Sequence, residues 1–311
     1  MAAHGLLLEK GRVPPSILVK ELKMSKVWFV TGANSGFGAS IVKAALAAGD
    51  RVVATARNME KLRSAFPDIR DDNTALVKLD VADASRAEAA VAEAVTRFGR
   101  INVLVNNAGN SYLGNFEELT NADIERQMET NFYGVVDVLR AALPILRKQR
   151  RGHIINVSST AGAAGFKHCT AYSASKFAVE GLTLSLALEV EPFGIKLTIV
   201  EPGFFRTNLL AAKNVSYAKS SIADYAHEGS AEAMWSGYDG KQPNDPDKLG
   251  EALVKLSNMT TPPLFFAAGP DALDAVRPVM EARLKDMREH EALSKAMVGD
   301  DGPSDTRPSG R

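Results

Sequence analysis

The 311-residue sequence lacks three features that would point to specialised classes of protein. It has one cysteine, Cys169, which excludes an internal disulfide framework and fits a reducing compartment. It has 37 basic and 37 acidic residues, and so lacks the basic excess of proteins that bind nucleic acid. It has no apolar run of the roughly 18–20 residues that a membrane-spanning helix needs, and its five histidines are scattered. We therefore expect a soluble, cytoplasmic protein with no metal, no nucleic-acid partner and no membrane span.

The two ends of the chain differ from the region between them. Residues 1–24 carry short apolar patches broken by charged residues and prolines, unlike the continuous apolar segment of a signal peptide. We interpret them as an N-terminal extension. Residues 299–311 contain almost no apolar side chain and are expected to form a disordered tail.

Between these ends, short apolar runs alternate with stretches of helical periodicity. The expected strands are residues 27–31, 51–55, 75–79, 103–106, 153–157, 196–200 and 264–267, and the expected helices are residues 40–48, 85–98, 123–146, 172–190 and 248–256. This alternation indicates βαβ units and a parallel sheet, and the uniformly apolar strands indicate that helices cover both faces. We therefore expect one α/β domain over residues 25–290, a doubly wound Rossmann-type parallel sheet of about seven strands flanked by helices.

A glycine-rich turn follows the first expected strand. Gly32, Gly36 and Gly38 have the spacing GxxxGxG, in which Gly32 permits a tight turn, Gly36 lets the backbone approach a pyrophosphate and Gly38 allows close helix packing. The free N–H groups of the next helix would then face the phosphates. The general dinucleotide fingerprint is GxGxxG, so this motif alone also fits an ordinary strand–helix turn.

Tyr172 and Lys176 are four residues apart in an expected helix and therefore share one face. Lowering the pKa of a phenol from near 10 by about three units requires about 4 kcal/mol. An ammonium about 4 Å away supplies roughly that energy at an effective dielectric constant near 20. The pair is predicted to be an acid/base device at neutral pH, although a half-buried tyrosine beside an ordinary lysine has the same spacing.

These residues belong to a series of short motifs that occur in a fixed order. The series is Thr31 to Gly38, Asn106-Asn107-Ala108-Gly109, Asn131, Ser159, Tyr172 with Lys176, and Pro202-Gly203. In this combination the sequence resembles the short-chain dehydrogenase/reductase family over roughly residues 25–285, and within it the hydroxysteroid-dehydrogenase-like NADP(H)-dependent reductases. The short segments that suggest this subgroup are Ala54-Thr55-Ala56-Arg57-Asn58, Glu201-Pro202-Gly203 and Pro262-Pro263.

The resemblance implies a catalytic set of four residues. Tyr172 is then the general acid/base at the reacting oxygen, and Lys176 lowers its pKa and holds the nicotinamide ribose. Ser159, thirteen residues before Tyr172, hydrogen-bonds the substrate oxygen, with Ser158 as the adjacent competitor. Asn131 holds a proton-relay water together with Lys176, although a water-bonded helix asparagine would look the same in the sequence.

The resemblance also implies a nicotinamide dinucleotide cofactor. The expected contacts are Gly32, Asn34, Ser35, Gly36, Phe37, Gly38, Arg57, Asp80, Val81, Asn107, Ala108, Gly109, Tyr172, Lys176, Pro202, Gly203 and Thr207. NADP(H) is predicted because Ala56 stands where dinucleotide folds place the acid that binds a free ribose 2′-hydroxyl. Arg57 follows with a planar fork suited to a 2′-phosphate, the alternative being a solvated surface arginine.

Residues 204–245 are interpreted as a substrate loop because they form a long segment rich in aromatic side chains. The prediction is an oxidoreductase that transfers a hydride between NADP(H) and a hydrophobic ketone, aldehyde or secondary alcohol. The alternatives are a ketoacyl-carrier-protein-type reductase and a catalytically inactive dinucleotide-binding regulatory protein. The resemblance further implies a homodimer or homotetramer formed through the helices at 123–146 and 172–190.

Overall fold

The computed structural model describes residues 25–69, 72–212 and 214–299. The predicted N-terminal extension and all but the first residue of the predicted tail therefore lie outside the described residues.

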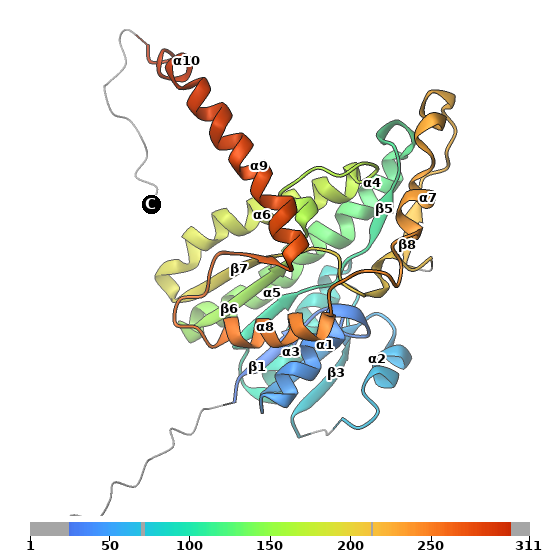
Figure 1. Ribbon diagram of the computed structural model, residues 1–311. Coiled ribbons are helices and arrows are strands. Elements are labelled where there is room, and N and C mark those ends of the chain that lie inside the picture. Colours follow the sequence, from blue (N-terminus) through green and yellow to red (C-terminus); the bar gives the residue numbers. More distant parts are fainter. Residues whose placement is uncertain (1–24, 70–71, 213, 300–311) are drawn as a thin grey trace, which may run out of the picture.

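A seven-stranded, fully parallel sheet in the order β3-β2-β1-β4-β6-β7-β9 forms the centre of the protein (Figure 1). The strands are β1 (Val27–Val30), β2 (Arg51–Ala56), β3 (Thr74–Lys78), β4 (Val103–Asn106), β6 (Gly152–Val157), β7 (Ile195–Pro202) and β9 (Phe265–Ala268). The chain runs outward from β1 to β3, returns to β4 and continues to the other edge. This order reverses beside β1, as in a doubly wound fold, so the predicted fold is confirmed. All seven predicted strands form within two residues of their expected bounds.

Helices cover both faces of the sheet and create two cores. One core lies under α1 (Gly36–Ala47), α2 (Met59–Ala65) and α8 (Pro246–Ser257), and the other under α3 (Ala84–Phe98), α5 (Gly134–Gln149) and α6 (Thr170–Val190). Successive strand residues point to opposite faces, so Trp28 and Val30 belong to the first core and Phe29 to the second. All three side chains are completely buried, which explains why the strands read as uniformly apolar.

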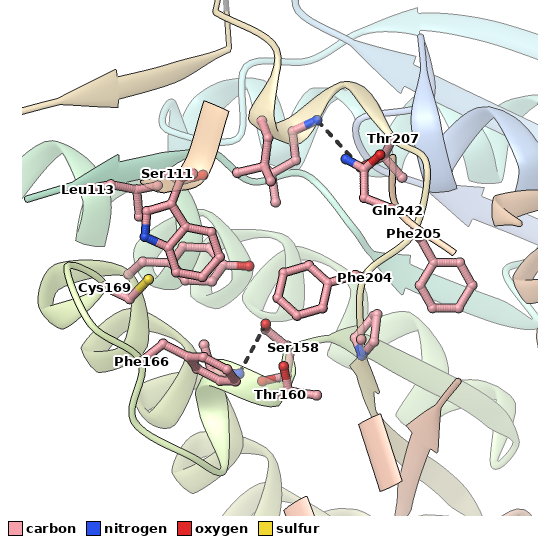
Figure 2. A pocket seen from close by; sticks show the side chains of 18 of the residues that line it. Ser111, Leu113, Ser158, Thr160, Phe166, Cys169, Phe204, Phe205, Thr207 and Gln242 are labelled. Atoms are coloured by element: carbon pink, nitrogen blue, oxygen red, sulfur yellow. Dashed lines mark hydrogen bonds between the residues drawn. The ribbon is translucent and has the colours of Figure 1, made fainter. Parts of the chain in front are cut away.

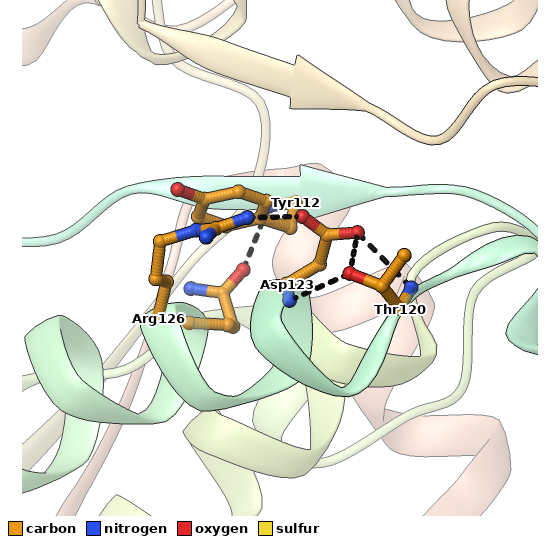
Figure 3. A network of polar contacts seen from close by, with 5 residues as sticks. Tyr112, Thr120, Asp123 and Arg126 are labelled. Atoms are coloured by element: carbon orange, nitrogen blue, oxygen red, sulfur yellow. Dashed lines mark hydrogen bonds and ion pairs between the residues drawn. The ribbon is translucent and has the colours of Figure 1, made fainter.

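The predicted single helix over residues 123–146 is wrong, because the structure divides it. It consists of α4 (Asn121–Met128), a π-helical segment (Glu129–Tyr133) and α5. Helix α4 begins with a capping box. The Thr120 hydroxyl accepts from the Asp123 backbone N–H, and the Asp123 carboxylate accepts from the Thr120 backbone N–H (Figure 3). Periodicity does not reveal a π segment, because one inserted residue leaves the apolar pattern on either side intact.

Residues 204–245, which we call the cap, are not a structureless loop. They contain β8 (Val215–Tyr217), α7 (Ala231–Ser236) and two 3₁₀ segments (Asn208–Leu210 and Ala223–Glu228). Strand β8 pairs with β5 (Ser111–Leu113) in a second, two-stranded sheet. Strands of three residues are too short to show alternation, so the sequence gives no signal for this sheet.

The last helices extend away from the body of the domain (Figure 1). In α9 (Pro270–Glu289) only Ala272 is buried, and α10 (Glu291–Lys295) has no buried residue. Among the residues that the structure describes, no helix is both long and apolar enough to cross a membrane.

Candidate active site

Two hollows meet at the carboxyl ends of the strands. The polar cleft has a cavity volume of about 460 Å³ and the apolar pocket one of about 110 Å³. Fourteen of the seventeen expected cofactor contacts line the polar cleft: Gly32, Asn34, Ser35, Gly36, Phe37, Arg57, Asp80, Val81, Asn107, Ala108, Gly109, Tyr172, Lys176 and Thr207. Pro202 and Gly203 line the apolar pocket instead, and Gly38 lines neither hollow. Tyr172 lines both hollows and so stands at their junction.

The glycine-rich turn has the geometry expected of a phosphate-binding loop. Gly32 and Gly36 have φ angles of +66° and +52°, in the left-handed region that favours glycine. A Cβ on Gly38 would collide with the carbonyl oxygen of Gly32 and lie 2.8 Å from Ala33 Cα. Gly38 is therefore required by the turn itself, rather than by packing of the helix on the sheet as predicted.

The segment after β4 braces this turn. The Asn107 side chain donates to the carbonyl oxygens of Thr31 and Gly32, at 2.9 and 3.2 Å. The Thr31 hydroxyl accepts from the backbone N–H groups of Asn107 and Ala108. The Asn107 amide thus ties the two loops together, a role that the sequence does not distinguish from a ligand contact.

One end of the polar cleft is lined by Ala56, Arg57, Asn58 and Lys61. Arg57 and Lys61 are exposed, and no carboxylate of the described residues forms an ion pair with either. Ala56 is 3% exposed and presents no acid. This end of the cleft is therefore cationic, and the contribution of Lys61 was not predicted.

The structure separates the roles of the two adjacent serines. Ser159 acts to lower the pKa of Tyr172, and its Oγ accepts from the backbone of Ala161 at 3.1 Å. Ser158 is buried and donates instead to Glu180 Oε1 at 2.6 Å. Ser159 is therefore the serine that acts on the tyrosine, and its role toward the substrate oxygen stays a prediction.

The predicted lowering of the tyrosine pKa by Lys176 is wrong for this structure. Desolvation raises the pKa of Tyr172 to about 12, against the opposing effect of the Ser159 hydrogen bond. The Lys176 Nζ lies 5.7 Å from the centroid of the Tyr172 ring and donates to the carbonyl oxygen of Val157 at 2.9 Å. Burial also lowers the pKa of Lys176 to about 8, while the charge of Glu180 acts in the opposite direction. The position of the Lys176 amine and the desolvation of the phenol explain the difference, and residue spacing reveals neither.

Asn131 lies in the π-helical segment and is 1% exposed. Its Oδ1 accepts from the Asn110 backbone at 3.0 Å, and its Nδ2 donates to Asn110 O and Ser175 Oγ, both at 3.1 Å. A Cβ built on Gly109 would lie 3.3 Å from Asn131 Oδ1 and 3.8 Å from Lys176 Nζ. The amide and the amine therefore converge on one point beside Gly109.

The apolar pocket lies beneath the cap (Figure 2). Its walls include Leu113, Phe166, Phe204, Phe205 and Trp235, and none of its lining residues within the described chain is charged. The ring of Phe204 stacks with that of Trp235 at a centroid distance of 6.2 Å. The pocket is thus suited to an uncharged, largely apolar ligand.

Asp271 fixes the turn at which the pocket begins. Its Oδ2 accepts from the Phe204 backbone at 2.5 Å, and its Oδ1 accepts from Asn244 Nδ2 at 2.6 Å. A side chain on Gly203 would collide with this carboxylate, which explains the glycine at that position. Asp271 lies in the first turn of α9, a helix that was not predicted from the sequence, so this role was missed.

Glu180 is the other acid that sequence reasoning missed, although a signal was present. Tyr172, Lys176 and Glu180 follow one another at intervals of four, which places all three on one helix face.

Comparison with known proteins identifies the family. Residues 26–218 match the family model for the short chain dehydrogenase. The chain is 38% identical to an oxidoreductase of Botryotinia fuckeliana, over 81% of this chain and 91% of the relative. It is 36% identical to a 3-ketodihydrosphingosine reductase of Bacteroides thetaiotaomicron, over 79% of this chain and 88% of the relative. A solved short-chain dehydrogenase from Streptomyces avermitilis is 38% identical, with a TM-score of 0.78 over 88% of this chain and 99% of its own. The protein therefore belongs to the short-chain dehydrogenase/reductase family of oxidoreductases.

Proposed function

We propose that the protein is an NADP(H)-dependent oxidoreductase that interconverts a hydrophobic ketone or aldehyde and the corresponding alcohol. The observation that carries the proposal is that Tyr172 lines both the polar cleft and the apolar pocket, with Ser159 in the pocket wall. A carbonyl carbon at this junction would have its oxygen beside two hydroxyl groups and its apolar body in the pocket. The 3-ketodihydrosphingosine reductase among the relatives supports a hydrophobic ketone as substrate.

The four expected catalytic residues have distinct parts in this proposal. Tyr172 donates its proton to the carbonyl oxygen during reduction, and its raised pKa keeps the phenol protonated at neutral pH. Ser159 holds the same oxygen. Lys176 and Asn131 hold a water at the point where their side chains converge, from which a proton reaches the tyrosine, and Lys176 also donates to the nicotinamide ribose. Bound in the polar cleft, NADP(H) supplies or accepts the hydride.

The polar cleft fits a nicotinamide dinucleotide. Gly36, a left-handed glycine, begins α1 and lines the cleft, so the N-terminus of this twelve-residue helix is available to phosphates. The exposed Arg57 and Lys61 supply cations for a ribose 2′-phosphate, and Ala56 offers no acid to a free hydroxyl.

The preference for NADP(H) is tested at Arg57. One charge-assisted contact contributes about 1.5–3 kcal/mol, so Arg57→Ala should raise the KM for NADPH by about 10-fold to 150-fold and change that for NADH little. Ala56→Asp should shift the preference toward NADH. Arg63→Ala, in which an exposed arginine of α2 outside the cleft is removed, is the matched control. A wild type that uses NADH more efficiently than NADPH would show the assignment to be wrong.

The reaction is tested with Tyr172→Phe. NADPH oxidation is measured against ketones and aldehydes graded by size and polarity, with a ketoacyl thioester included for the carrier-protein alternative. Turnover should fall by at least about 100-fold in Tyr172→Phe while NADPH still binds, because only the proton donor is lost. Tyr133→Phe, at an exposed tyrosine, is the control. Equal turnover by Tyr172→Phe and wild type would contradict the catalytic assignment, and an inactive wild type that binds NADPH would favour the regulatory protein.

We also propose that the protein is cytoplasmic and associates through α6. Phe177, Leu184 and Leu188 lie on one face of this helix and are 49%, 39% and 57% exposed. This apolar stripe supports a homodimer or homotetramer, which analytical ultracentrifugation tests directly.

A further inference from the structure

Helix α9 projects from the domain with most of its length uncovered (Figure 1). It has twenty residues, of which only Ala272, near its beginning, is buried. It contacts β9 and the 3₁₀ segment Thr160–Gly162, and its outer part continues beyond them. Most of the stability of a helix in a protein comes from packing of an apolar face, so α9 needs a partner along its outer part.

Five apolar side chains form a stripe along α9: Leu273, Val276, Met280, Leu284 and Met287. At about 100° per residue, they all lie within about 40° of Met280 around the helix axis. The exposed fraction is 40% at the central Met280 and reaches 64% at Met287. A helix with this spacing normally buries one narrow face, and here that face is open to solvent.

The stripe is symmetric about its central residue. Leu273 and Met287 lie seven positions on either side of Met280, and Val276 and Leu284 lie four positions on either side. An antiparallel copy of the helix, turned about a two-fold axis at Met280, therefore brings Leu273 of one copy against Met287 of the other. Val276 then meets Leu284, and Met280 meets its own counterpart. A patch that is complementary to itself is what an isologous two-fold interface requires.

The charges on one flank of the stripe are complementary in the same arrangement. This flank, at about 60–120° from Met280 around the axis, carries Asp274, Arg277, Glu281 and Arg288. In the antiparallel pair, Arg277 lies within two positions, or about 3 Å along the axis, of Glu281 of the second copy. Asp274 lies equally close to Arg288 of the second copy. Long side chains span this offset, so acids face bases across the pair.

A lipid surface is the other occupant that an exposed amphipathic helix can have. Helices that lie on membranes combine a polar face rich in lysine and arginine with an apolar face of aromatic and leucine side chains. Helix α9 has five acidic and four basic residues and no aromatic side chain. The balance of charges and the symmetry of the stripe therefore favour a second copy of the chain.

We propose that α9 is an association helix, which packs antiparallel on α9 of a second copy of the chain about a two-fold axis at Met280. This interface is separate from the one proposed at α6, and a tetramer with D2 symmetry contains two different two-fold interfaces of this kind. The stripe has five side chains per copy, whereas a standard interface has about 20–30 residues per side. The association should therefore depend on protein concentration.

The first test measures the mass of the full chain by analytical ultracentrifugation, up to about 100 µM protein. Met280→Glu places two carboxylates at the axis and should reduce the mass of the associated protein by one half. Ala282→Glu adds the same charge on the opposite, exposed side of α9 and should associate as wild type. Equal masses for Met280→Glu and wild type overturn the proposal. So does a monomeric wild type, and one that sediments with vesicles of phosphatidylcholine and phosphatidylserine would identify a lipid surface as the occupant.

The second test addresses the antiparallel arrangement. Arg277→Glu and Glu281→Arg should each weaken association, because each places like charges across the pair, and the double variant should restore it. On oxidation, Met280→Cys should form a disulfide between two copies, whereas Ala282→Cys should not, because only position 280 lies at the axis. The native Cys169 is buried and does not compete. A double variant that associates no better than the single ones, or equal cross-linking by the two cysteine variants, overturns the antiparallel pairing.

Discussion

Replacing Glu180 by glutamine should move the pH dependence of cofactor binding toward lower pH. Glu180 is 8% exposed and lies four residues after Lys176 on the same face of α6. Its charge raises the pKa of Lys176, which burial lowers to about 8. Glutamine retains an oxygen that can accept from Ser158, so the substitution removes the charge with little change in size.

The magnitude follows from the spacing on the helix. The Cβ atoms of residues four apart on a helix lie about 5–6 Å from each other, and two unit charges about 6 Å apart would interact by about 3 kcal/mol at an effective dielectric constant near 20. This corresponds to about 2 pKa units. This figure is an upper bound on the shift, because solvent and nearby dipoles screen the interaction. The lysine is an ammonium below its pKa, so NADPH affinity should fall as pH rises through about 8 in wild type and at a lower pH in Glu180→Gln.

The assay is NADPH binding followed by fluorescence at a series of pH values, which requires no substrate. Glu189→Gln, at an exposed acid of the same helix, is the matched control and should titrate as wild type. An unchanged midpoint in Glu180→Gln, with normal folding, would refute the electrostatic link between Glu180 and Lys176.

Three other changes test the fold and the site. Gly38→Ala should lower the Tm by about 3–10 °C and weaken NADPH binding, because the new methyl group collides with the backbone of the turn. The control is Gly181→Ala, at a helix position with open space, which should raise the Tm slightly. Equal changes of Tm in the two variants would contradict the steric explanation. Burial raises the pKa of Glu201 from 4.5 to about 7, so the stability that its protonation contributes is present below pH 4.5 and is lost as pH rises through 7. In urea denaturation at pH 8, Glu201→Gln should therefore have a free energy of unfolding up to about 3 kcal/mol above that of wild type. The same difference between variant and wild type at acidic and alkaline pH would exclude this linkage. Lys176→Ala should lose both activity and NADPH affinity, and unchanged affinity would contradict the ribose contact.

Local patterns were sufficient for the fold. The seven strands of the sheet appear in the sequence as apolar, β-branched runs, and their separation by helices implies parallel pairing. The turn at Gly32 and Gly36 was also predictable, because a left-handed backbone between a strand and a helix favours glycine. The pairing of β5 with β8 was not, since its register depends on contacts across more than a hundred residues of chain.

In the candidate site, too, some features were predictable from the sequence and others were not. The order of motifs predicted that Asn131, Ser159, Tyr172 and Lys176 belong together. In the structure Tyr172 and Lys176 line the polar cleft, Ser159 and Tyr172 line the apolar pocket, and Asn131 is buried beside Gly109. The order of motifs could not predict that Asn131 lies in a π-helical segment and bonds Asn110. Nor could it predict that Ser158 bonds Glu180 while Ser159 acts on Tyr172. These choices depend on where neighbouring elements lie.

The sequence by itself determined the fold, the glycine-rich turn and the shared helix face of Tyr172 and Lys176, because each depends on residue type and spacing within one or two neighbouring elements. Tertiary structure alone decided the direction of the Tyr172 pKa shift, since desolvation depends on every group that surrounds the phenol. It also decided that Ser111 and Gln242, 131 positions apart in the sequence, line one pocket. Burial and long-range contact are properties of the assembled molecule, and no local pattern encodes them.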